Sequence, residues 1–466
     1  MKPAVTNSAA QRHASSQSCA KPETGLWKRG LMWLLMLGPF FFISYGFANY
    51  ITGLRSDIGI VVFSWEQAIP LWPWTIIPYW SIDLLYGLSF LLPFTRQEMD
   101  RHALRLLMVQ LICVAGFLLW PLTMSFARPE LSGVFGWMFD VLMGFDKPFN
   151  QAPSLHIALL VVLWARFGAH TAPRLRPLLH LWFFLIGLSV LTTWQHHFID
   201  VPTGALVGFF CLWLWPINQA SPLARFKLTA NPQRRLLASR YLFGAVILLI
   251  IAITLGGTAL WLSWPAISLF MVALNYAGVG AAGFQKQANG HLSGAALVLF
   301  APYLAGAWLN SRLWTRRAPA PVFVAEQVWL GRFPSNSDKA NAAALMDVCA
   351  ELLVNAQNKP YCQVPILDLT TPSLAQCRAA GEHIAELRAH GPVLVYCALG
   401  YSRSASAVVA WLLISGTCRT LEQAVACVRA ARPVVVLTPE HLAVLSLLAS
   451  EVNAADPLFI VQKREA

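Results

Sequence analysis

Residues 392–414 read Pro392-Val-Leu-Val-Tyr396-Cys397-Ala-Leu-Gly-Tyr-Ser-Arg403-Ser404, followed by the apolar run Ala-Ser-Ala-Val-Val-Ala-Trp-Leu-Leu-Ile. The apolar residues 393–396 predict a short buried strand, and the apolar run after Ser404 predicts a helix. Between them, the glycine at position 400 indicates a tight loop. A loop wrapped at a helix N-terminus points several backbone N–H groups at one spot, which favours a bound anion. The stretch therefore predicts a strand–loop–helix unit that holds a phosphate group.

The residues of this loop supply the chemistry for breaking a phosphate ester. The positive field of the loop favours the thiolate form of Cys397, which can attack phosphorus. Arg403, six residues later, can grip two phosphate oxygens at once. The hydroxyl of Ser404 can assist departure of the thiolate in a second step. The loop residues expected to bind phosphate are Ala398, Leu399, Gly400, Tyr401, Ser402 and Arg403.

A general acid is still needed for the leaving group. Asp368, in the stretch Val364-Pro-Ile-Leu-Asp368-Leu-Thr-Thr-Pro, follows a strand-like run and precedes Cys397 by 29 positions. A helix-like stretch at 374–389 lies between them. We therefore predict that Asp368 protonates the leaving group.

Residues 321–455 resemble the dual-specificity (protein-tyrosine-type) phosphatase family. The opening Val328-Trp-Leu-Gly-Arg-Phe-Pro334 is similar to the first strand of that family, and Ala431-Arg-Pro-Val434 is similar to its closing segment. Tyr396 departs from the His that the family usually carries before the nucleophile; it is expected to support the loop rather than react. The resemblance implies a phosphoprotein or phospholipid substrate. Because the residues between Cys397 and Arg403 include no Lys or Arg, nothing here selects polyphosphorylated inositides.

The rest of the chain has the composition of a membrane protein. Apolar residues make up 57% of the 466 residues and charged residues 12%, against about 25% charged in ordinary soluble domains. Apolar blocks of about the length needed to cross a bilayer predict spans at 31–49, 74–94, 104–124, 153–168, 177–195, 200–217, 241–262, 264–283 and 291–311. The predicted fold is a polytopic α-helical membrane domain followed by a soluble α/β cysteine-phosphatase domain.

The net charge of +12 does not indicate a nucleic-acid partner, because the basic residues lie mostly in short loops between the apolar blocks. That is the positive-inside pattern. It puts the N-terminus inside, and it puts the loops near 50–73, 125–152 and 195–200 outside. Nine crossings would place the C-terminal domain outside, but Arg312, Arg316 and Arg317 favour the inside. We therefore expect one re-entrant span and a cytoplasmic C-terminal domain.

Two further motifs flank the fourth and fifth spans. Residues 150–157 read Asn-Gln-Ala-Pro-Ser154-Leu-His156-Ile, and residues 194–200 read Trp-Gln-His196-His-Phe-Ile-Asp200. In the predicted topology both lie at the outer ends of spans, so they can meet at one membrane face. A histidine oriented by a carboxylate can attack phosphorus, and a second histidine can protonate the leaving group. Ser154 can donate a hydrogen bond to the phosphate.

These motifs resemble the type-2 phosphatidic acid phosphatase superfamily, in particular the sphingomyelin synthase and inositol phosphorylceramide synthase branch. The resemblance implies that His156 is the acid, His196 the nucleophile and Asp200 its orienting partner. Arg128, followed by proline, matches the end of the first motif and would contact phosphate, whereas the Lys and the second Arg of the superfamily are absent. His197 is the alternative nucleophile. The order of the two regions resembles bacterial membrane proteins that fuse them, which implies the bacterial inner membrane.

The expected domains follow from these features: an N-terminal disordered segment 1–24, a membrane domain 25–217, a basic cytoplasmic loop 218–240, additional spans and a linker 241–317, the phosphatase domain 318–457 and a tail 458–466. Six of nine cysteines lie in the last 120 residues with no C-x-x-C pair, which fits a reducing compartment and indicates no zinc site. No cofactor and no metal are expected.

The favoured hypothesis is a membrane enzyme with two phosphatase sites that acts on lipid phosphates. Three alternatives remain open: a membrane-anchored protein-tyrosine or dual-specificity phosphatase, a lipid headgroup phosphotransferase in the membrane domain, and a lipid-binding scaffold with inactive sites. The presence of all the predicted catalytic residues disfavours the scaffold. The sequence leaves the oligomeric state open.

Overall fold

The structure, a computed structural model, describes residues 23–356 and 358–455. The predicted tail 458–466 and nearly all of the predicted N-terminal segment 1–24 lie outside these residues. Contacts divide the chain into two compact units. Unit 1 runs to Arg225 and includes Ile251–Trp261, whereas unit 2 combines Phe226–Ile250 with the residues from Leu262 onward.

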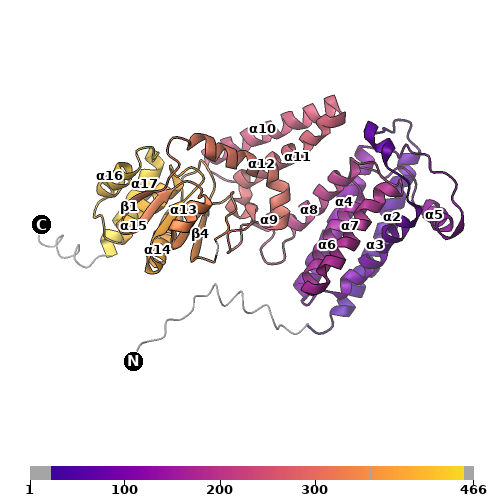
Figure 1. Ribbon diagram of the computed structural model, residues 1–466, viewed down its shortest axis with the longest axis horizontal. Helices are drawn as coiled ribbons and strands as arrows, with labels where there is room; N and C mark the ends of the chain where they lie inside the picture. Colours follow the sequence, from indigo (N-terminus) through magenta and orange to yellow (C-terminus); the bar gives the residue numbers. More distant parts are fainter. Residues whose placement is uncertain (1–22, 357, 456–466) are drawn as a thin grey trace, which may run out of the picture. The chain divides into compact units, whose positions relative to one another are not determined.

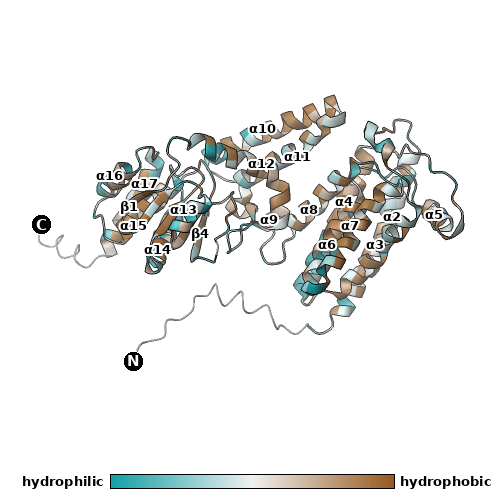
Figure 2. Cartoon of the chain, in the orientation of Figure 1, coloured by the Kyte–Doolittle hydropathy of each residue, from teal (hydrophilic) through white to brown (hydrophobic). Residues whose placement is uncertain are grey.

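Unit 1 is a bundle of apolar helices (Figures 1 and 2). Its helices are α2 (Leu26–Gly53), α3 (Ile76–Leu88), α4 (Arg96–Leu119), α5 (Gly133–Phe145), α6 (Leu155–His170), α7 (Arg176–Thr192), α8 (Asp200–Leu214) and the short α9 (Pro222–Arg225). Short 3-10 turns lie at Ser64–Ala68, Pro73–Thr75, Ser89–Leu91, Pro173–Leu175 and Gly257–Leu262. Helix α5 corrects the expectation of a loop over 125–152. It was missed because an apolar stretch of 13 residues is too short for a span.

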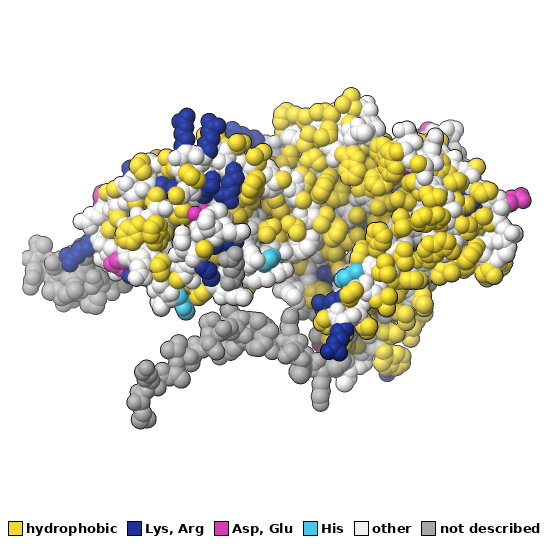
Figure 3. All heavy atoms as spheres, in the orientation of Figure 1, with side chains coloured by type: hydrophobic (Ala, Val, Ile, Leu, Met, Phe, Trp, Pro, Cys, Tyr) yellow, Lys and Arg dark blue, Asp and Glu magenta, His cyan; other side chains and the backbone are white. Residues whose placement is uncertain are grey.

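Many large apolar side chains of unit 1 face outward, which is unusual for a soluble protein. In α2, Leu31, Leu35, Phe42 and Ile43 are exposed, and hydrophobic atoms cover much of the visible surface of this unit (Figure 3). Among the residues that the structure describes, six helices are long and apolar enough to cross a membrane: Leu26–Gly53, Arg96–Leu119, Pro173–Thr192, Pro232–Leu255, Gly257–Val279 and Gly294–Trp314. Each coincides with a predicted span, and α3, α6 and α8 account for the other three.

Unit 2 joins further apolar helices to an α/β domain. The helices are α10 (Pro232–Leu255), α11 (Ser263–Leu274), which continues as a π-turn over Asn275–Val279, and α12 (Gly294–Trp314). A 3-10 turn covers Ala281–Phe284. Because α10 begins at Pro232, the basic residues expected in the loop 218–240 lie partly in its first turns.

The α/β domain is built on a five-stranded sheet of order β1-β2-β5-β3-β4. Strand β1 (Val322–Ala325) pairs antiparallel with β2 (Val328–Gly331), and the remaining pairs, with β3 (Ala344–Cys349), β4 (Tyr361–Ile366) and β5 (Val393–Tyr396), are parallel. The helices are α13 (Asn336–Asn341), α14 (Leu374–Leu387), which ends in the 3-10 turn Arg388–His390, α15 (Arg403–Ile414), α16 (Leu421–Ala431) and α17 (Pro439–Ala455). Strand β5 lies in the middle, as its fully apolar sequence predicts.

The two faces of this sheet have different coverings, because side chains alternate along a strand. Met346, Val348 and Val395 pack with α14, α15, α16 and α17 in the main core. On the other face, Leu345, Leu394 and Tyr396 form a smaller cluster, against which Ala307 of α12 packs. One of the apolar helices therefore takes part in covering the sheet of the α/β domain.

Candidate functional site

The predicted phosphate-binding loop connects β5 to α15. Cys397 directly follows the central strand, and the carboxyl ends of parallel strands are where α/β folds place their ligands. The Cys397 sulfur accepts two hydrogen bonds of 3.2 Å, one from the backbone N–H of Gly400 and one from the Ser404 hydroxyl. The Cys397 sulfur is thus held by one backbone donor of the loop and by the first hydroxyl of α15.

The tight turn of the loop requires glycine at position 400. Its backbone φ is +75°, and a Cβ there would lie 2.6 Å from the backbone carbonyl of Gly331. The loop is also held from outside. Arg432 donates to the carbonyl oxygen of Gly400 at 3.1 Å, and the backbone N–H of Val436 donates to the carbonyl oxygen of Tyr401 at 3.0 Å. The segment 431–434, singled out as a closing element, thus braces the loop.

Arg403 is buried and fully engaged in its position. Both of its terminal nitrogens donate to the Glu351 carboxylate, at 2.9 and 2.8 Å. They also donate to the carbonyl oxygen of Ile366 at 2.8 Å and to Asp368 at 2.7 Å. A bidentate carboxylate fixes the plane of a guanidinium, so Glu351 sets the orientation in which Arg403 meets a phosphate.

Glu351 is the functional residue that sequence reasoning missed. It comes two residues after the end of β3, where a carboxylate directly behind a strand of six buried residues was the available signal. Burial opposes its ionisation, but the charge and hydrogen bonds of Arg403 outweigh burial and lower the pKa of Glu351. It is therefore a permanent anion at neutral pH.

Asp368 lies in the turn after β4, with 26% of its side chain exposed. Burial raises its pKa above the ordinary aspartate value, and the nearby Glu351 carboxylate adds to this effect, while Arg403 opposes it. A raised pKa is what a general acid needs, because the group must carry a proton to donate. In the structure Asp368 contacts Arg403, and Ser404 contacts Cys397.

Tyr396, which departs from the family pattern, is buried in the sheet. It pairs in register with Asp347 of β3, and its ring packs edge-to-face on Phe333 with centroids 5.9 Å apart. Its side chain thus packs in the smaller hydrophobic cluster on one face of the sheet.

The second predicted site lies in unit 1, around a cavity of about 120 Å³. His196 Nδ1 lies 3.1 Å from Asp200 and its Nε2 lies 3.1 Å from the Ser154 hydroxyl. Asp200 also accepts the backbone N–H of His197 at 3.0 Å. The close approach of the two motifs depends on Gly204, where a Cβ would lie 2.4 Å from the Ser154 carbonyl oxygen.

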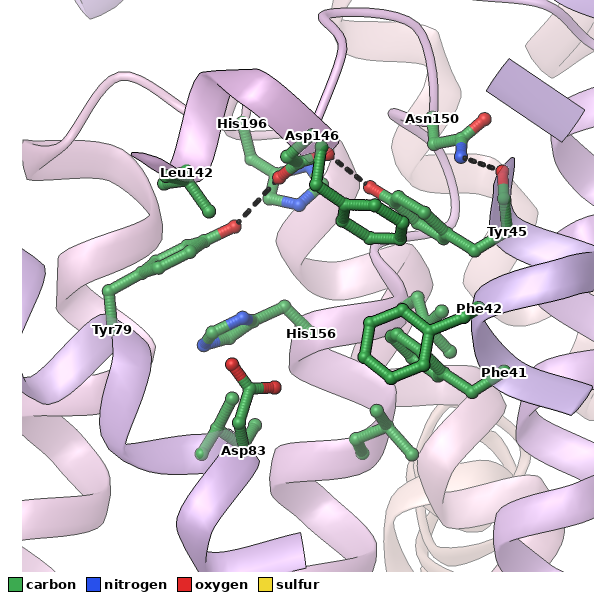
Figure 4. Close-up of a pocket in the computed structure, with 14 residues that line it drawn as sticks. Phe41, Phe42, Tyr45, Tyr79, Asp83, Leu142, Asp146, Asn150, His156 and His196 are labelled. Atoms are coloured by element: carbon green, nitrogen blue, oxygen red, sulfur yellow. Dashed lines mark hydrogen bonds between the residues drawn. The ribbon is translucent and has the colours of Figure 1, made fainter. Parts of the chain in front are cut away.

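Figure 4 shows His156 in the same cavity. Above it, Asp146 lies between two tyrosines and connects them, and Asp83 lies below it. Tyr45 and Tyr79 donate to Asp146 at 2.5 and 3.3 Å. Within the described residues, His156 Nε2 has no hydrogen-bond partner, and the ring stacks on Tyr79 with centroids 4.2 Å apart. The aromatic and acidic lining was not predicted, because its members come from α2, α3 and the turn after α5.

His197 and Arg128 are engaged elsewhere. His197 Nδ1 lies 3.0 Å from Glu66, and its Nε2 accepts the backbone N–H of Ser125 at 3.1 Å. His196 lines the cavity together with His156, whereas His197 is not among its lining residues, so the geometry favours His196 over His197. Arg128 donates to the carbonyl oxygen of Thr193, at 3.0 Å for the shorter bond, and is not among the residues that line the cavity.

One group of possible metal ligands occurs in the described part of the chain. Atoms of Cys362, His383 and Glu386 lie within 4.8 Å of one another. The side chains of His383 and Glu386 are 38% and 71% exposed. The contacts described above for Cys397 and Arg403 do not include this group.

Comparisons with known proteins assign the C-terminal part of the chain. Residues 328–451 match the family model "Dual specificity phosphatase, catalytic domain". A comparison with curated proteins returned no match. Among solved structures, the active form of Tk-PTP is 28% identical, covering 28% of this chain and 98% of that chain at a TM-score of 0.26. Human DUSP28 is 26% identical, with 29% and 99% coverage and a TM-score of 0.27.

A third similar structure is PTPMT1, solved in complex with PI(5)P. It is 21% identical and covers 28% of this chain and 95% of that chain, with a TM-score of 0.26. The family match includes the elements that place the candidate catalytic residues, which are β3, β4, β5 and α15. Residues 328–451 of this chain are therefore a dual-specificity phosphatase catalytic domain, preceded by a region of long apolar helices.

Proposed function

We propose that this protein is a membrane-embedded phosphatase that hydrolyses phosphomonoesters of phospholipids at Cys397. The observation that carries the lipid assignment is the contact between α12 and the phosphate-binding loop. The Ser311 hydroxyl of this apolar helix donates to the backbone carbonyl of Ala398 at 2.5 Å. The loop around Cys397 therefore lies against a helix that is long and apolar enough for a membrane, which favours a substrate held at a membrane surface. Tethering of this kind raises the effective concentration of the enzyme at its substrate.

The reaction uses the residues around Cys397 in two steps. The thiolate attacks phosphorus while Asp368 gives its proton to the departing alcohol oxygen, which leaves a phosphocysteine. Water then attacks phosphorus, Asp368 takes a proton from that water, and the Cys397 thiolate leaves with the help of Ser404. Arg403 and the backbone N–H groups of the loop bind the phosphate oxygens throughout.

A phosphate panel tests this proposal on the full-length protein in detergent. Phosphate release is measured from phospholipid monoesters and from a phosphotyrosine peptide, with wild type and Cys397→Ser side by side. The proposal expects lipid hydrolysis that depends on Cys397 and exceeds peptide hydrolysis. A clear preference for the peptide would identify a membrane-anchored protein phosphatase instead, and no Cys397-dependent release from either would support the scaffold alternative.

A second activity is proposed for the cavity in unit 1, supported by the Ser154–His196–Asp200 chain of hydrogen bonds. The Asp200 carboxylate accepts a hydrogen bond from the Nδ1–H of His196, so Nε2 carries the lone pair that attacks phosphorus. His156 then protonates the leaving group. The acceptor in the second step is water in a phosphatase and a lipid alcohol in a phosphotransferase.

This second activity is measured in the Cys397→Ser background, where the C-terminal site is silent. Phosphate release and headgroup transfer to an added lipid alcohol are followed together. If adding His196→Ala abolishes phosphate release, the site is a phosphatase. If it abolishes headgroup transfer, the site is a phosphotransferase. If neither product forms before that change, the site is inactive.

A further inference from the structure

The turn that carries Asp368 is hydrogen-bonded by side chains of the apolar helices. The Tyr276 hydroxyl, from the π-turn after α11, donates to the backbone carbonyl of Asp368 at 2.8 Å. Gln233, in the first turn of α10, donates from Nε2 to the backbone carbonyl of Leu369 at 2.8 Å. Two consecutive carbonyls of the acid-bearing turn are thus fixed from outside the α/β domain.

The backbone of this turn needs such support. Leu369 has a φ of +55°, in the left-handed region that branched and bulky residues avoid. A residue in this conformation costs of order 1 kcal/mol and persists only where its surroundings hold it. The two helix-derived hydrogen bonds act on the carbonyls immediately before and after that strained φ and ψ pair.

The supporting tyrosine is itself held in place. Tyr276 is 1% exposed, and its ring stacks on that of Tyr241 in α10, with centroids 5.3 Å apart and an interplanar angle of 29°. A buried hydroxyl has a fixed direction and little access to water as an alternative partner. Its hydrogen bond to the acid-bearing turn is therefore specific.

We propose that Tyr276 and Gln233 are positioning residues for the general acid, so that the apolar helices complete the phosphatase site instead of only anchoring it. This rests on the proposed phosphatase function with Asp368 as the acid. Neither side chain contacts the reacting atoms. They hold the turn that keeps the Asp368 carboxyl at the Arg403 end of the site, where it contacts Nη2 in the absence of phosphate.

A positioning role predicts a dependence on the leaving group. Proton donation matters for an alkoxide, which is a poor leaving group, and matters little for a nitrophenolate, which departs unprotonated. Removal of the Tyr276 hydroxyl should therefore impair hydrolysis of alkyl phosphates selectively. A merely structural role would impair both substrate types equally.

The experiment compares kcat of the full-length protein on a small alkyl phosphate and on nitrophenyl phosphate. Tyr276→Phe and Gln233→Ala are measured beside Asp368→Asn as the reference for complete loss of the acid. The matched control is Gln363→Ala, which removes a bond of 2.9 Å from Gln363 to the carbonyl of Gln287 and does not touch the carbonyls of Asp368 and Leu369.

We expect Tyr276→Phe to lower kcat on the alkyl phosphate about tenfold more than kcat on nitrophenyl phosphate, which is the same selectivity as that of Asp368→Asn. Gln233→Ala should show a smaller selectivity of this kind. Gln363→Ala should show none. Retained nitrophenyl hydrolysis shows that the variant is folded. Equal effects on the two substrates, or no effect, would overturn the positioning role. If wild type hydrolyses neither substrate, the proposed phosphatase function itself fails, so the two failures are distinct.

Discussion

Asp368 and Arg403 bind each other: a carboxylate oxygen of the candidate acid lies 2.7 Å from the arginine nitrogen that would bind phosphate. Each terminal nitrogen of Arg403 carries two hydrogens, and these are used by Glu351, Ile366 and Asp368. We therefore expect a phosphate that binds at Arg403 to displace Asp368. That exchange frees the acid at the moment when a leaving oxygen comes within its reach.

Replacing Asp368 with Ala should produce a variant that binds phosphate more tightly and turns over slowly. The competitor for Arg403 is gone, while the proton donor is lost. We expect kcat on an alkyl phosphate to fall by about 10²–10⁴-fold, with a lower inhibition constant for inorganic phosphate or vanadate. Weaker binding of these anions would show that Asp368 does not compete with them.

The pH profile reports on the same carboxyl group. Burial raises the pKa of Asp368, and the proposed acid can donate a proton only in its protonated form. Alkyl phosphate hydrolysis should therefore fall as pH rises through this raised pKa. In Asp368→Asn this fall in rate should vanish, and the remaining low rate should not depend on pH over that range. A fall in rate that survives in Asp368→Asn would have to come from another group.

Glu351→Gln should destabilise the domain as well as the active site. It leaves the buried Arg403 charge without its main partner, which typically costs about 3–5 kcal/mol. Chemical denaturation measures this loss. Because the folded pKa of Glu351 is lowered, the contribution of the pair is complete above the unfolded pKa of about 4.3 and is lost as pH falls through the folded value. A variant of wild-type stability would contradict the ion pair.

Gly400→Ala should abolish Cys397-dependent hydrolysis. A methyl group there meets the Gly331 carbonyl at 2.6 Å in addition to the strain of a positive φ. Gly416 provides the control, since its φ is +72° but a Cβ there meets nothing within 4 Å. Gly416→Ala should cost about 1 kcal/mol or more in stability and leave catalysis intact. Similar activities for the two variants would argue against a sterically defined loop.

Lys286 and Asp347 should be strongly coupled in a double-mutant cycle. Lys286, from the loop between α11 and α12, reaches Asp347 of β3 at 2.6 Å and the carbonyl of Cys349 at 2.7 Å, and both charged side chains are buried. Lys286→Met alone should cost about 3–5 kcal/mol. Adding Asp347→Asn should recover much of that, because no unpaired charge remains. Additive losses would show that the two groups are independent.

His196→Gln and His197→Gln should differ in the Cys397→Ser background. His196 is linked to Ser154 and Asp200, whereas His197 is linked to Glu66 and Ser125. Product formation at the unit 1 site should be lost with His196→Gln and retained with His197→Gln. The reverse result would move the nucleophile by one position.

Local sequence patterns predicted the parts of the fold that are continuous in sequence. The run 392–404 specified β5, the loop and the start of α15, because strand, glycine turn and helix are set by neighbouring residues. Apolar blocks predicted the long helices, since span length is a property of one segment. Helix α5 escaped because it is short, and α10 begins earlier than expected because charged residues do not end a helix.

Partners that are distant in sequence could not be predicted in this way. Glu351 binds Arg403 from 52 positions away, and Asp146 meets Tyr45 from 101 positions away. Only the packing of the chain brings such pairs together. The same holds for Tyr276, which reads in the sequence as one more aromatic residue of an apolar helix.

The buried Lys286–Asp347 pair bears on proteolytic shedding. A protease that cut the chain between α12 and β1 would release the α/β domain without Lys286 and leave a bare carboxylate inside the sheet, next to the strand that ends at the nucleophile. We expect the shed fragment to unfold and be degraded. Cleavage near residue 318 would then act as an off-switch for the phosphatase and would not liberate a soluble form of it.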